Sequence, residues 1–307
     1  MKDVISCSIG LIQSEDSKLL YIERIKKPYQ GQFEFPGGKI RNSETPKSAI
    51  IRELKEELDI KVTKTRFIGN IHHNYPEFKV TLYVFSIDSY EGEIKSINRG
   101  LCYRSLSELK NGFNAIQSCM KVLKLNLLLP KIKILECNQV LLNNADLPKI
   151  DNDDISSQMI RLRNLKASEN IQPDILNSFI KNNPHNYIID YPCEKFFHER
   201  FVGIHFKSKY LSTLKSIPKD ITLYSASCHN LEEVEHANRL ELDYILISPV
   251  LLAKHIHQQT LGWDGFRKLS EKANMPTYAL GGICSNDHDY ALSLKYGGFG
   301  IAGIKKF

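Results

Sequence analysis

The segment GKIRNSE (38–44), followed shortly by RELKEELDI (52–60), is the most informative stretch of the chain. Around it, apolar residues recur at the spacing of a helix that runs from about Pro46 to Leu58. These apolar residues are Ala49, Ile50, Leu54 and Leu58. Because they form one stripe, we expect the carboxylates of the same segment to lie off the buried face of the helix.

Three glutamates share the polar side of this predicted helix. Glu53 and Glu57 are spaced i,i+4 and Glu56 is i,i+3 from Glu53, so all three can project from one face. Carboxylates packed together repel one another, and a hard cation such as Mg²⁺ or Mn²⁺ relieves the repulsion. Arg52 can pair with Glu56 one turn on, and Gly37 allows a backbone carbonyl to approach the cation. The alternative is a solvated acidic helix face, which the glycines upstream disfavour.

These segments resemble the Nudix box, G-x5-E-x7-R-E-U-x-E-E-x-G-U, in which U is an aliphatic residue. Every fixed position matches except one, since Asp59 stands where the family has Gly. That glycine ends the helix in a left-handed conformation, which Asp tolerates moderately. The resemblance implies an α+β Nudix fold and attack of water on a phosphoanhydride. It also implies catalytic roles for Arg52, Glu53, Glu56 and Glu57, and a metal site formed by these glutamates and the carbonyl of Gly37.

The likeness extends to the MutT type within that family. The run EFPGGKI (34–40) is similar to the segment before the helix in MutT, and YPEF (75–78) corresponds to part of its middle strand. The implied reaction is cleavage of 8-oxo-dGTP to 8-oxo-dGMP and pyrophosphate, with Mg²⁺ as the cofactor. The implied substrate-binding residues are Arg24, Glu34, Phe35, Pro36, Gly37, Phe78 and Asn114.

Several of these substrate contacts have a second interpretation. Asn114 opens the predicted last helix, where its amide can read a purine edge, but Asn is also a common helix cap. Phe35 and Phe78 are base-contact candidates, although aromatic residues in strands more often belong to the core. Arg24 can face the nucleotide or lie on the surface.

One loop departs from the MutT pattern. MutT-like proteins carry a further metal-binding Glu before the last strand, whereas the corresponding loop here reads IKSINRG (94–100) and contains no acid. Glu91 and Glu93 lie just upstream, and either is a candidate replacement. The number of metal ions is therefore open.

The first domain is expected to span residues 1–128. Alternating patterns predict strands at 4–12, 18–24, 65–73 and 78–88, a loop at 28–38, and a last helix at about 114–126. From residue 129 to 307, short apolar strands alternate with helical patterns, which predicts an α/β TIM-type barrel. The helical patterns include Gln172–Lys181, Leu231–Arg239 and Gly265–Ala273, while an Asn/Asp-rich stretch at 143–154 replaces the first helix. The predicted barrel strands are Lys131–Leu135, Met159–Arg163, Tyr187–Asp190, Phe201–His205, Thr222–Ser225, Tyr244–Ser248, Thr277–Leu280 and Gly298–Ala302.

This second region resembles the thiamine phosphate synthase/TenI barrels. The resemblance lies in IRLR (160–163), IDY (189–191), GIH (203–205), SASCHNLEE (225–233), SPV (248–250), GGI (281–283) and GIAGI (300–304). It implies a ligand site at the carboxyl ends of the strands. The candidate residues of that site are Arg161, Arg163, Asp190, His229, Gly281 and Gly282.

Synthase activity is nevertheless expected to be lost. In the synthases the turn after the GIH-like segment carries Gln, Glu and Asp, the last of which helps to hold Mg²⁺ and diphosphate. Here residues 206–209 read FKSK, so Lys207 and Lys209 stand near the expected metal position. This exchange favours binding of a thiazole or thiamine phosphate, or a structural role, over catalysis. His229 could move protons in a TenI-like reaction or simply start a helix.

The overall composition fits this interpretation. The net charge of +6 suits an anionic small substrate such as a nucleoside triphosphate, and no dense basic block predicts direct nucleic-acid binding. The cysteines are odd in number, scattered and without a C-x-x-C pair, which is typical of reduced thiols in the cytoplasm. No signal peptide or membrane span is expected. A thiamine-pathway pyrophosphate is the alternative substrate, and a barrel that regulates the hydrolase is a third possibility.

Overall fold

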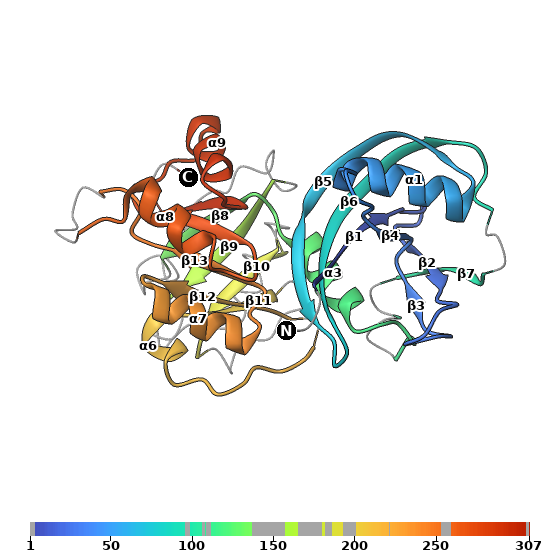
Figure 1. Ribbon diagram of the computed structural model, residues 1–307. Coiled ribbons are helices and arrows are strands. Elements are labelled where there is room, and N and C mark those ends of the chain that lie inside the picture. Colours follow the sequence, from blue (N-terminus) through green and yellow to red (C-terminus); the bar gives the residue numbers. More distant parts are fainter. Residues whose placement is uncertain are drawn as a thin grey trace. The chain divides into compact units, whose positions relative to one another are not determined.

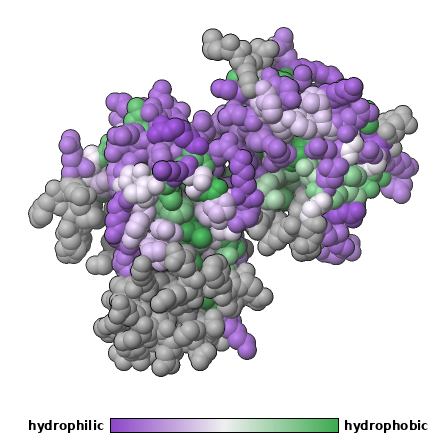
Figure 2. Space-filling view, turned by 90° about the horizontal axis from the view of Figure 1, so that it is seen from below, coloured by the Kyte–Doolittle hydropathy of each residue, from purple (hydrophilic) through white to green (hydrophobic). Residues whose placement is uncertain are grey.

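The computed structural model describes residues 4–95, 99–105, 108, 112–136, 157–164, 180–181, 186–192, 201–220, 222–252, 259–304 and 307. The chain divides into two compact units, residues 1–126 and 127–307 (Figure 1). On the face seen in Figure 2, hydrophilic side chains make up much of the coloured surface, with apolar residues between them. Within the ranges given above, no helix has the length and apolar character needed to cross a bilayer.

The first unit is an α+β fold with two sheets, as the sequence predicts. The larger sheet has the order β4-β1-β6-β5, in which β1 and β6 are parallel and the other pairs antiparallel. The smaller sheet has the order β3-β2-β7. The strands are β1 (Val4–Leu11), β2 (Leu19–Glu23), β3 (Phe33–Glu34), β4 (Gly37–Lys39), β5 (Lys61–Asn74), β6 (Lys79–Glu91) and β7 (Leu101–Arg104). The helices used below are α1 (Pro46–Leu58) and α3 (Ser118–Leu127).

Helix α1 has the predicted bounds because its ends are defined locally. The side chain of Thr45 accepts a hydrogen bond from the backbone N–H of Ser48, the Ser48 side chain caps Thr45 in return, and Pro46 occupies the first turn. The four apolar stripe residues are all fully buried. The helix ends at Asp59, which adopts the left-handed conformation with φ of 56°. The expectation that Asp takes over the role of glycine here is confirmed.

Strand β1 packs one face toward α1 and turns the other toward a cavity. Its side chains alternate, as the pleat requires. The hydroxyl of Ser8 donates to the carbonyl of Pro46 at the start of α1. A Cβ on Gly10 would lie 3.3 Å from Ile50 of α1. On the opposite face, Ile5, Cys7 and Ile9 line the cavity.

The predicted start of the last helix is wrong by one turn. Helix α3 begins at Ser118 rather than near Asn114. Residues before it run extended beside β3, because Phe33 N–H donates to the carbonyl of Asn114 and Ile116 N–H donates to the carbonyl of Phe33. This pairing uses the backbone groups that a longer helix would need.

Two other segments also differ from the prediction. The loop predicted at 28–38 contains β3 and the start of β4, two strands too short for a periodic pattern to be visible. Residues 75–78 do not lie in a strand but connect β5 to β6, and Tyr75 N–H donates to the carbonyl of Phe78 across this turn.

The second unit is a closed parallel barrel with the strand order β10-β11-β12-β13-β14-β15-β8-β9. All eight predicted strands are present, and the TIM-type barrel is confirmed. Strands β10 and β13 are buried at every position, because both faces of a parallel sheet are covered. The strands are β8 (Lys131–Glu136), β9 (Gln158–Arg163), β10 (Tyr187–Asp190), β11 (Phe201–Phe206), β12 (Leu223–Cys228), β13 (Tyr244–Ile247), β14 (Thr277–Leu280) and β15 (Gly300–Gly303).

The barrel helices that the structure describes follow β11, β12, β13 and β14. They are α6 (Ser208–Leu211), α7 (Leu231–Leu240), α8 (Gly262–Ser270) and α9 (Asp287–Lys295). The helices predicted at 231–239 and 265–273 correspond to α7 and α8. The Asn/Asp-rich stretch at 143–154 and all but the last two residues of the helix predicted at 172–181 lie outside the described residues.

Candidate active site

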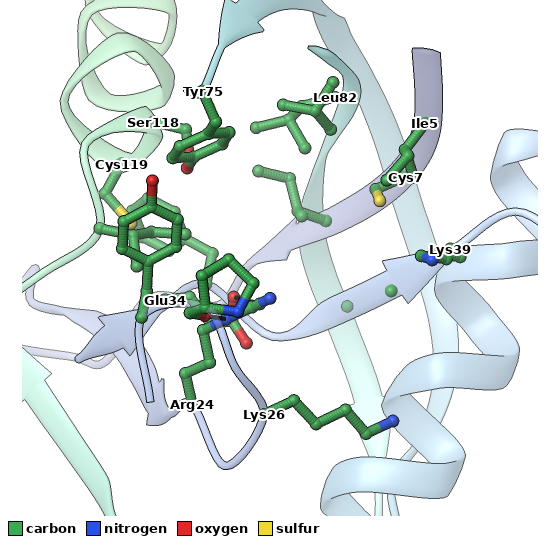
Figure 3. A pocket seen from close by; sticks show the side chains of 18 of the residues that line it. Ile5, Cys7, Arg24, Lys26, Glu34, Lys39, Tyr75, Leu82, Ser118 and Cys119 are labelled. Carbon is green, nitrogen blue, oxygen red and sulfur yellow. Dashed lines mark hydrogen bonds and ion pairs between the residues drawn. The ribbon is translucent and has the colours of Figure 1, made fainter. Parts of the chain in front are cut away.

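A cavity of about 570 Å³ opens in the first unit, lined by β1, β4 and β6 of the large sheet and by the start of α3. Figure 3 shows Ile5 and Cys7 of β1, Leu82 of β6 and Ser118 of α3 around this space. This volume is in the usual range for a site that takes a small molecule. The lining includes a group formed by Glu53, Glu57 and Arg99, called the charged end below, and a group formed by Tyr29, Tyr75 and Phe78, called the aromatic end.

The charged end brings two glutamates of α1 against the glycines of β4. Glu53 and Glu57 both line the cavity together with Gly37 and Gly38. The N–H of Gly37 donates to Oε2 of Glu57 over 2.9 Å. A Cβ on Gly38 would lie 2.5 Å from Cδ of Glu53, so only glycine leaves room for this carboxylate. The two carboxylates therefore pack directly against the glycines of β4.

Arg52 fixes the carboxylates of this segment from outside. Its guanidinium lies 2.8 Å from Glu44, 2.7 Å from Glu53 and 3.2 Å from Glu56. The predicted pairing with Glu56 is present, but the contacts with Glu44 and Glu53 are shorter. Hydrogen bonding to Arg52 lowers the pKa of Glu44 to about 2. Glu44 thereby stays ionised and anchors Arg52, which in turn orients Glu53.

Glu56 does not join the other two glutamates. Its side chain is 47% exposed and lies 3.1 Å from Arg41 as well as near Arg52. Across the part of the chain that the structure describes, no group of three His, Cys, Asp or Glu side chains is placed to hold a metal ion. The predicted set of three carboxylates is thus brought together only in part. Two carboxylates and a backbone carbonyl still fit Mg²⁺, which proteins often bind through one or two carboxylates plus substrate phosphates.

A further cation, Arg99, lies at the charged end. Its Nη1 is 2.6 Å from Oε1 of Glu57, and both side chains are largely buried. Burial raises the pKa of Glu57 to about 7, against the opposing effect of Arg99 and the Gly37 N–H. Sequence reasoning missed Arg99, although it stands in the loop where the resemblance leads one to expect an acid.

Neither proposed replacement for that acid reaches the cavity lining. Glu91 pairs with Lys61 over 2.9 Å at the far end of the β5–β6 pair, and Glu93 lies 3.4 Å from Lys95. Both glutamate side chains are mostly exposed, at 64% and 81%. The structure therefore supplies a cation, rather than another carboxylate, beside Glu57.

The aromatic end is built around Tyr75. Its ring centroid lies 4.9 Å from that of Phe78 and 5.1 Å from that of Tyr29. The Tyr75 hydroxyl donates to Oγ of Ser118 over 2.8 Å, and Figure 3 shows these two side chains next to each other in the cavity. Tyr75 and Ser118 were not singled out from the sequence, because the turn and the helix start that bring them together are distant in the chain.

Five of the seven predicted substrate-binding residues line the cavity, namely Arg24, Glu34, Phe35, Gly37 and Phe78. Arg24 and Glu34 form an ion pair of 2.7 Å, visible in Figure 3. The other two are not in the lining. Pro36 is buried and its carbonyl accepts from Gly10 N–H. Asn114 is exposed, and its amide donates to the carbonyl of Gly31 over 3.4 Å rather than capping α3.

In the barrel, a buried ion pair joins two of the predicted ligand residues. Nε of Arg161 on β9 lies 2.7 Å from Oδ1 of Asp190, which ends β10. Lys207 follows β11, and its Nζ lies 3.5 Å from Oδ2 of Asp190 and 2.6 Å from the side-chain oxygen of Asn164. Arg163 pairs instead with Glu136 over 3.1 Å. An ammonium thus stands beside Asp190.

The remaining predicted barrel residues make separate contacts. The ring of His229 is 2.7 Å from the carbonyl of Ser248, and Asn230 rather than His229 caps α7. Gly281 and Gly282 have φ of 99° and 66°, and a Cβ on either would lie within 2.9 Å of the backbone of residues 249–251. These glycines therefore allow close packing of two loops. Lys209 turns to the ring of Tyr210.

His205 on β11 is a buried titratable group close enough to this cluster to sense its charges. It is fully buried, and its two ring nitrogens lie 2.9 Å from the hydroxyls of Ser225 and Ser227. Burial holds the pKa of His205 well below its usual value, and the positive charges of Arg161, Arg163 and Lys207 act in the same direction. The ring is therefore neutral in the folded protein.

The pH dependence of stability is expected to change when His205 is replaced. The unfolded chain takes up a proton on this histidine near pH 6.5, whereas the folded barrel does not. The free energy of unfolding is therefore unaffected by His205 above that pH, and it falls by up to about 1.4 kcal/mol per pH unit below it. His205→Gln should reduce the loss of Tm between pH 7.5 and pH 5.5. The control His288→Gln, at an exposed position, should keep the wild-type loss. An equal loss in all three proteins would show that His205 does not carry this effect.

Comparisons with known proteins agree with the two units. A model described as NUDIX domain matches residues 6–117, and one described as thiamine monophosphate synthase matches residues 203–307. An 8-oxo-dGTP diphosphatase of Proteus vulgaris is 32% identical over 102 residues, which are 33% of this chain and 90% of that protein. The corresponding diphosphatase of Escherichia coli K12 is 31% identical over 87 residues, 28% of this chain and 67% of that protein. A thiamine-phosphate synthase of Prochlorococcus marinus is 32% identical over 90 residues, which are 28% of this chain but only 26% of that protein.

The fold, the cavity and these similarities define a hydrolase of phosphoric anhydrides joined to a parallel barrel. The chain belongs to the Nudix hydrolase family. Its barrel is similar to the thiamine monophosphate synthases.

Proposed function

We propose that the first unit is a Mg²⁺-dependent pyrophosphohydrolase that converts 8-oxo-dGTP to 8-oxo-dGMP and pyrophosphate. The observation that carries this proposal is a single cavity that joins the Glu53–Glu57 pair to an aromatic end. A nucleoside triphosphate has the matching chemistry, with an anionic chain at one end and a flat base at the other. The similarity to two 8-oxo-dGTP diphosphatases supports the choice of base.

In this proposal Glu53, Glu57 and the carbonyl of Gly37 would hold the cation. When bound, Mg²⁺ neutralises phosphate charge and lowers the pKa of the attacking water. Arg52 keeps Glu53 in place through its contact of 2.7 Å, and the Gly37 N–H holds one oxygen of Glu57. Glu56 would contribute only by leaving its two arginine partners.

The base would lie at the aromatic end. Tyr75 and Phe78 line the cavity and offer flat apolar surfaces, on which an aromatic base can stack. Polar groups that could meet the base edge are the Ser118 hydroxyl and the Arg24–Glu34 pair. Asn114 remains a predicted base contact, although its exposed amide would have to give up its weak bond to Gly31.

Replacing Asn114 with Ala decides whether this amide reads the base. If it does, Asn114→Ala lowers the preference for 8-oxo-dGTP over dGTP by about 1–3 kcal/mol, because a hydrogen-bonding edge is left unpaired. The measurement is kcat/KM for both nucleotides, and Gln117→Ala, at a nearby exposed amide, serves as the control. An equal loss on both nucleotides would contradict base reading and assign Asn114 to the segment beside β3.

The proposed substrate is tested by comparing kcat/KM for 8-oxo-dGTP, the four normal dNTPs and hydroxymethylpyrimidine pyrophosphate. We expect 8-oxo-dGTP to be hydrolysed with the highest kcat/KM. The pyrimidine pyrophosphate is included because the barrel is similar to thiamine monophosphate synthases, which favours a thiamine-pathway pyrophosphate as the second candidate. A preference for that compound would replace the nucleotide proposal.

Binding of a thiamine or thiazole phosphate by the barrel remains a prediction, with Lys207 as the cation beside Asp190.

A further inference from the structure

Both carboxylate oxygens of Glu57 are already engaged by the protein itself. Oε1 lies 2.6 Å from Nη1 of Arg99, and Oε2 accepts the Gly37 N–H over 2.9 Å. Exposure of the two side chains is 17% for Arg99 and 9% for Glu57, so water screens this pair weakly. Arg99 thus occupies an oxygen that a divalent cation at Glu57 would take.

A guanidinium and a divalent cation on the same carboxylate repel each other. The repulsion is stronger in this partly buried site than it would be in water, because the surroundings screen the charges less. Arg99 therefore either weakens cation binding or moves when the cation arrives. The backbone next to Arg99 is held in place, because the carbonyl of Gly100 accepts a hydrogen bond from the N–H of Glu23 in β2 over 2.8 Å. The long side chain alone can change direction.

The destination for the guanidinium follows from the charges of the cavity. Arg24 is already held by Glu34 over 2.7 Å and by the carbonyl of Pro28 over 2.7 Å. Arg99, in contrast, is held by Glu57, and it would lose this partner when the proposed cation binds to Glu57. Guanidinium groups bind phosphate oxygens through two parallel hydrogen bonds, and a substrate phosphate would lie beside the cation.

We propose that Arg99 is a phosphate-binding residue of this hydrolase, which pairs with Glu57 in the free protein and transfers its guanidinium to the substrate's phosphate chain when the cation binds. This inference rests on the proposed metal role of Glu57. Cation binding and phosphate binding would then be cooperative, since the Arg99 guanidinium becomes available to the phosphate only when it no longer pairs with Glu57. It also gives a positive residue a function in the loop where the sequence resemblance predicts an acid.

The test measures binding rather than turnover, with Mn²⁺ and inorganic pyrophosphate as probes of the full-length chain in calorimetry. In Arg99→Ala, Mn²⁺ should bind about fivefold more tightly without pyrophosphate, because the competing charge is gone. Pyrophosphate should bind about tenfold more weakly at saturating Mn²⁺, because a charge-assisted contact is lost. Arg99→Gln, which retains a donor for Glu57, should show the same directions and guards against a folding defect of the Ala variant. Arg66→Ala removes an exposed charge that does not line the cavity, and should change neither affinity.

The outcomes separate this inference from the proposed function. Weaker Mn²⁺ binding with unchanged pyrophosphate binding in both Arg99 variants would show that Arg99 only supports Glu57, and would overturn the inference. Unchanged affinities in both variants would overturn it as well. If instead the wild-type chain binds no Mn²⁺, or Glu57→Gln does not weaken Mn²⁺ binding, the metal role of Glu57 fails and the inference fails with it.

Discussion

Replacing Glu53 or Glu57 with Gln is expected to lower kcat by about a hundredfold or more while leaving the fold intact. The reason is that the amide removes the negative charge on which the cation depends, and with it the electrostatic stabilisation of the transition state. Gln has nearly the same shape, and its carbonyl oxygen can still accept the Gly37 N–H that Glu57 accepts in the structure. The measurement is steady-state hydrolysis of 8-oxo-dGTP, with circular dichroism to check the fold.

Glu91→Gln is the matched control for these variants. It makes the same chemical change at an exposed glutamate that pairs with Lys61 away from the cavity. Its kcat should equal that of the wild type. Full activity of both Glu53→Gln and Glu57→Gln would contradict the assignment of these residues to the metal site.

Replacing the two glycines of β4 with Ala is expected to have different effects, on metal binding at Gly38 and on stability at Gly37. A Cβ on Gly38 would meet the end of the Glu53 side chain at 2.5 Å, and a carboxylate can move aside. Gly38→Ala should therefore fold but bind Mn²⁺ about tenfold to a hundredfold more weakly, as when groups supporting metal ligands are altered. A Cβ on Gly37 would lie 2.2 Å from the carbonyl oxygen of Ser8, in a backbone with φ of 142°. Gly37→Ala should lower the free energy of unfolding by more than about 3 kcal/mol.

Gly31→Ala separates steric contact from backbone preference. Gly31 has φ of 82°, but a Cβ there would meet nothing within 4 Å. Gly31→Ala should lower the free energy of unfolding by about 1–2 kcal/mol, the usual penalty for a left-handed residue that has a side chain. Chemical denaturation measures all three variants. Equal stability of the Gly37 and Gly31 variants, or normal Mn²⁺ binding by Gly38→Ala, would contradict the close packing on which this comparison rests.

The sequence predicted the features that local patterns determine. The bounds of α1 follow from its cap at Thr45 and its apolar stripe, and the left-handed conformation of Asp59 follows from its place where the motif has glycine. The barrel strands were predicted because each is a short apolar run that is buried on both faces. In the cavity, Phe35 and Phe78 were found through a motif and a neighbouring segment.

The remaining features depend on contacts between distant segments. Glu56 shares a helix face with Glu53 and Glu57, but it pairs with Arg41 and with the Arg52 nitrogen that also contacts Glu53, and it does not line the cavity. The Tyr75–Ser118 contact joins residues 43 positions apart, and the Arg99–Glu57 contact joins residues 42 apart. Residues 114–116 pair with β3 instead of extending α3. Periodicity within a segment carries no information about such partners.

Mg²⁺-dependent formation of pyrophosphate from 8-oxo-dGTP is the most direct test of the account. Purified full-length protein is incubated with 8-oxo-dGTP in Mg²⁺ or in EDTA, and the products are separated by ion-exchange chromatography. The account predicts 8-oxo-dGMP and pyrophosphate in equal amounts with Mg²⁺, and no cleavage in EDTA. Release of single phosphate groups, or undiminished cleavage in EDTA, would contradict it.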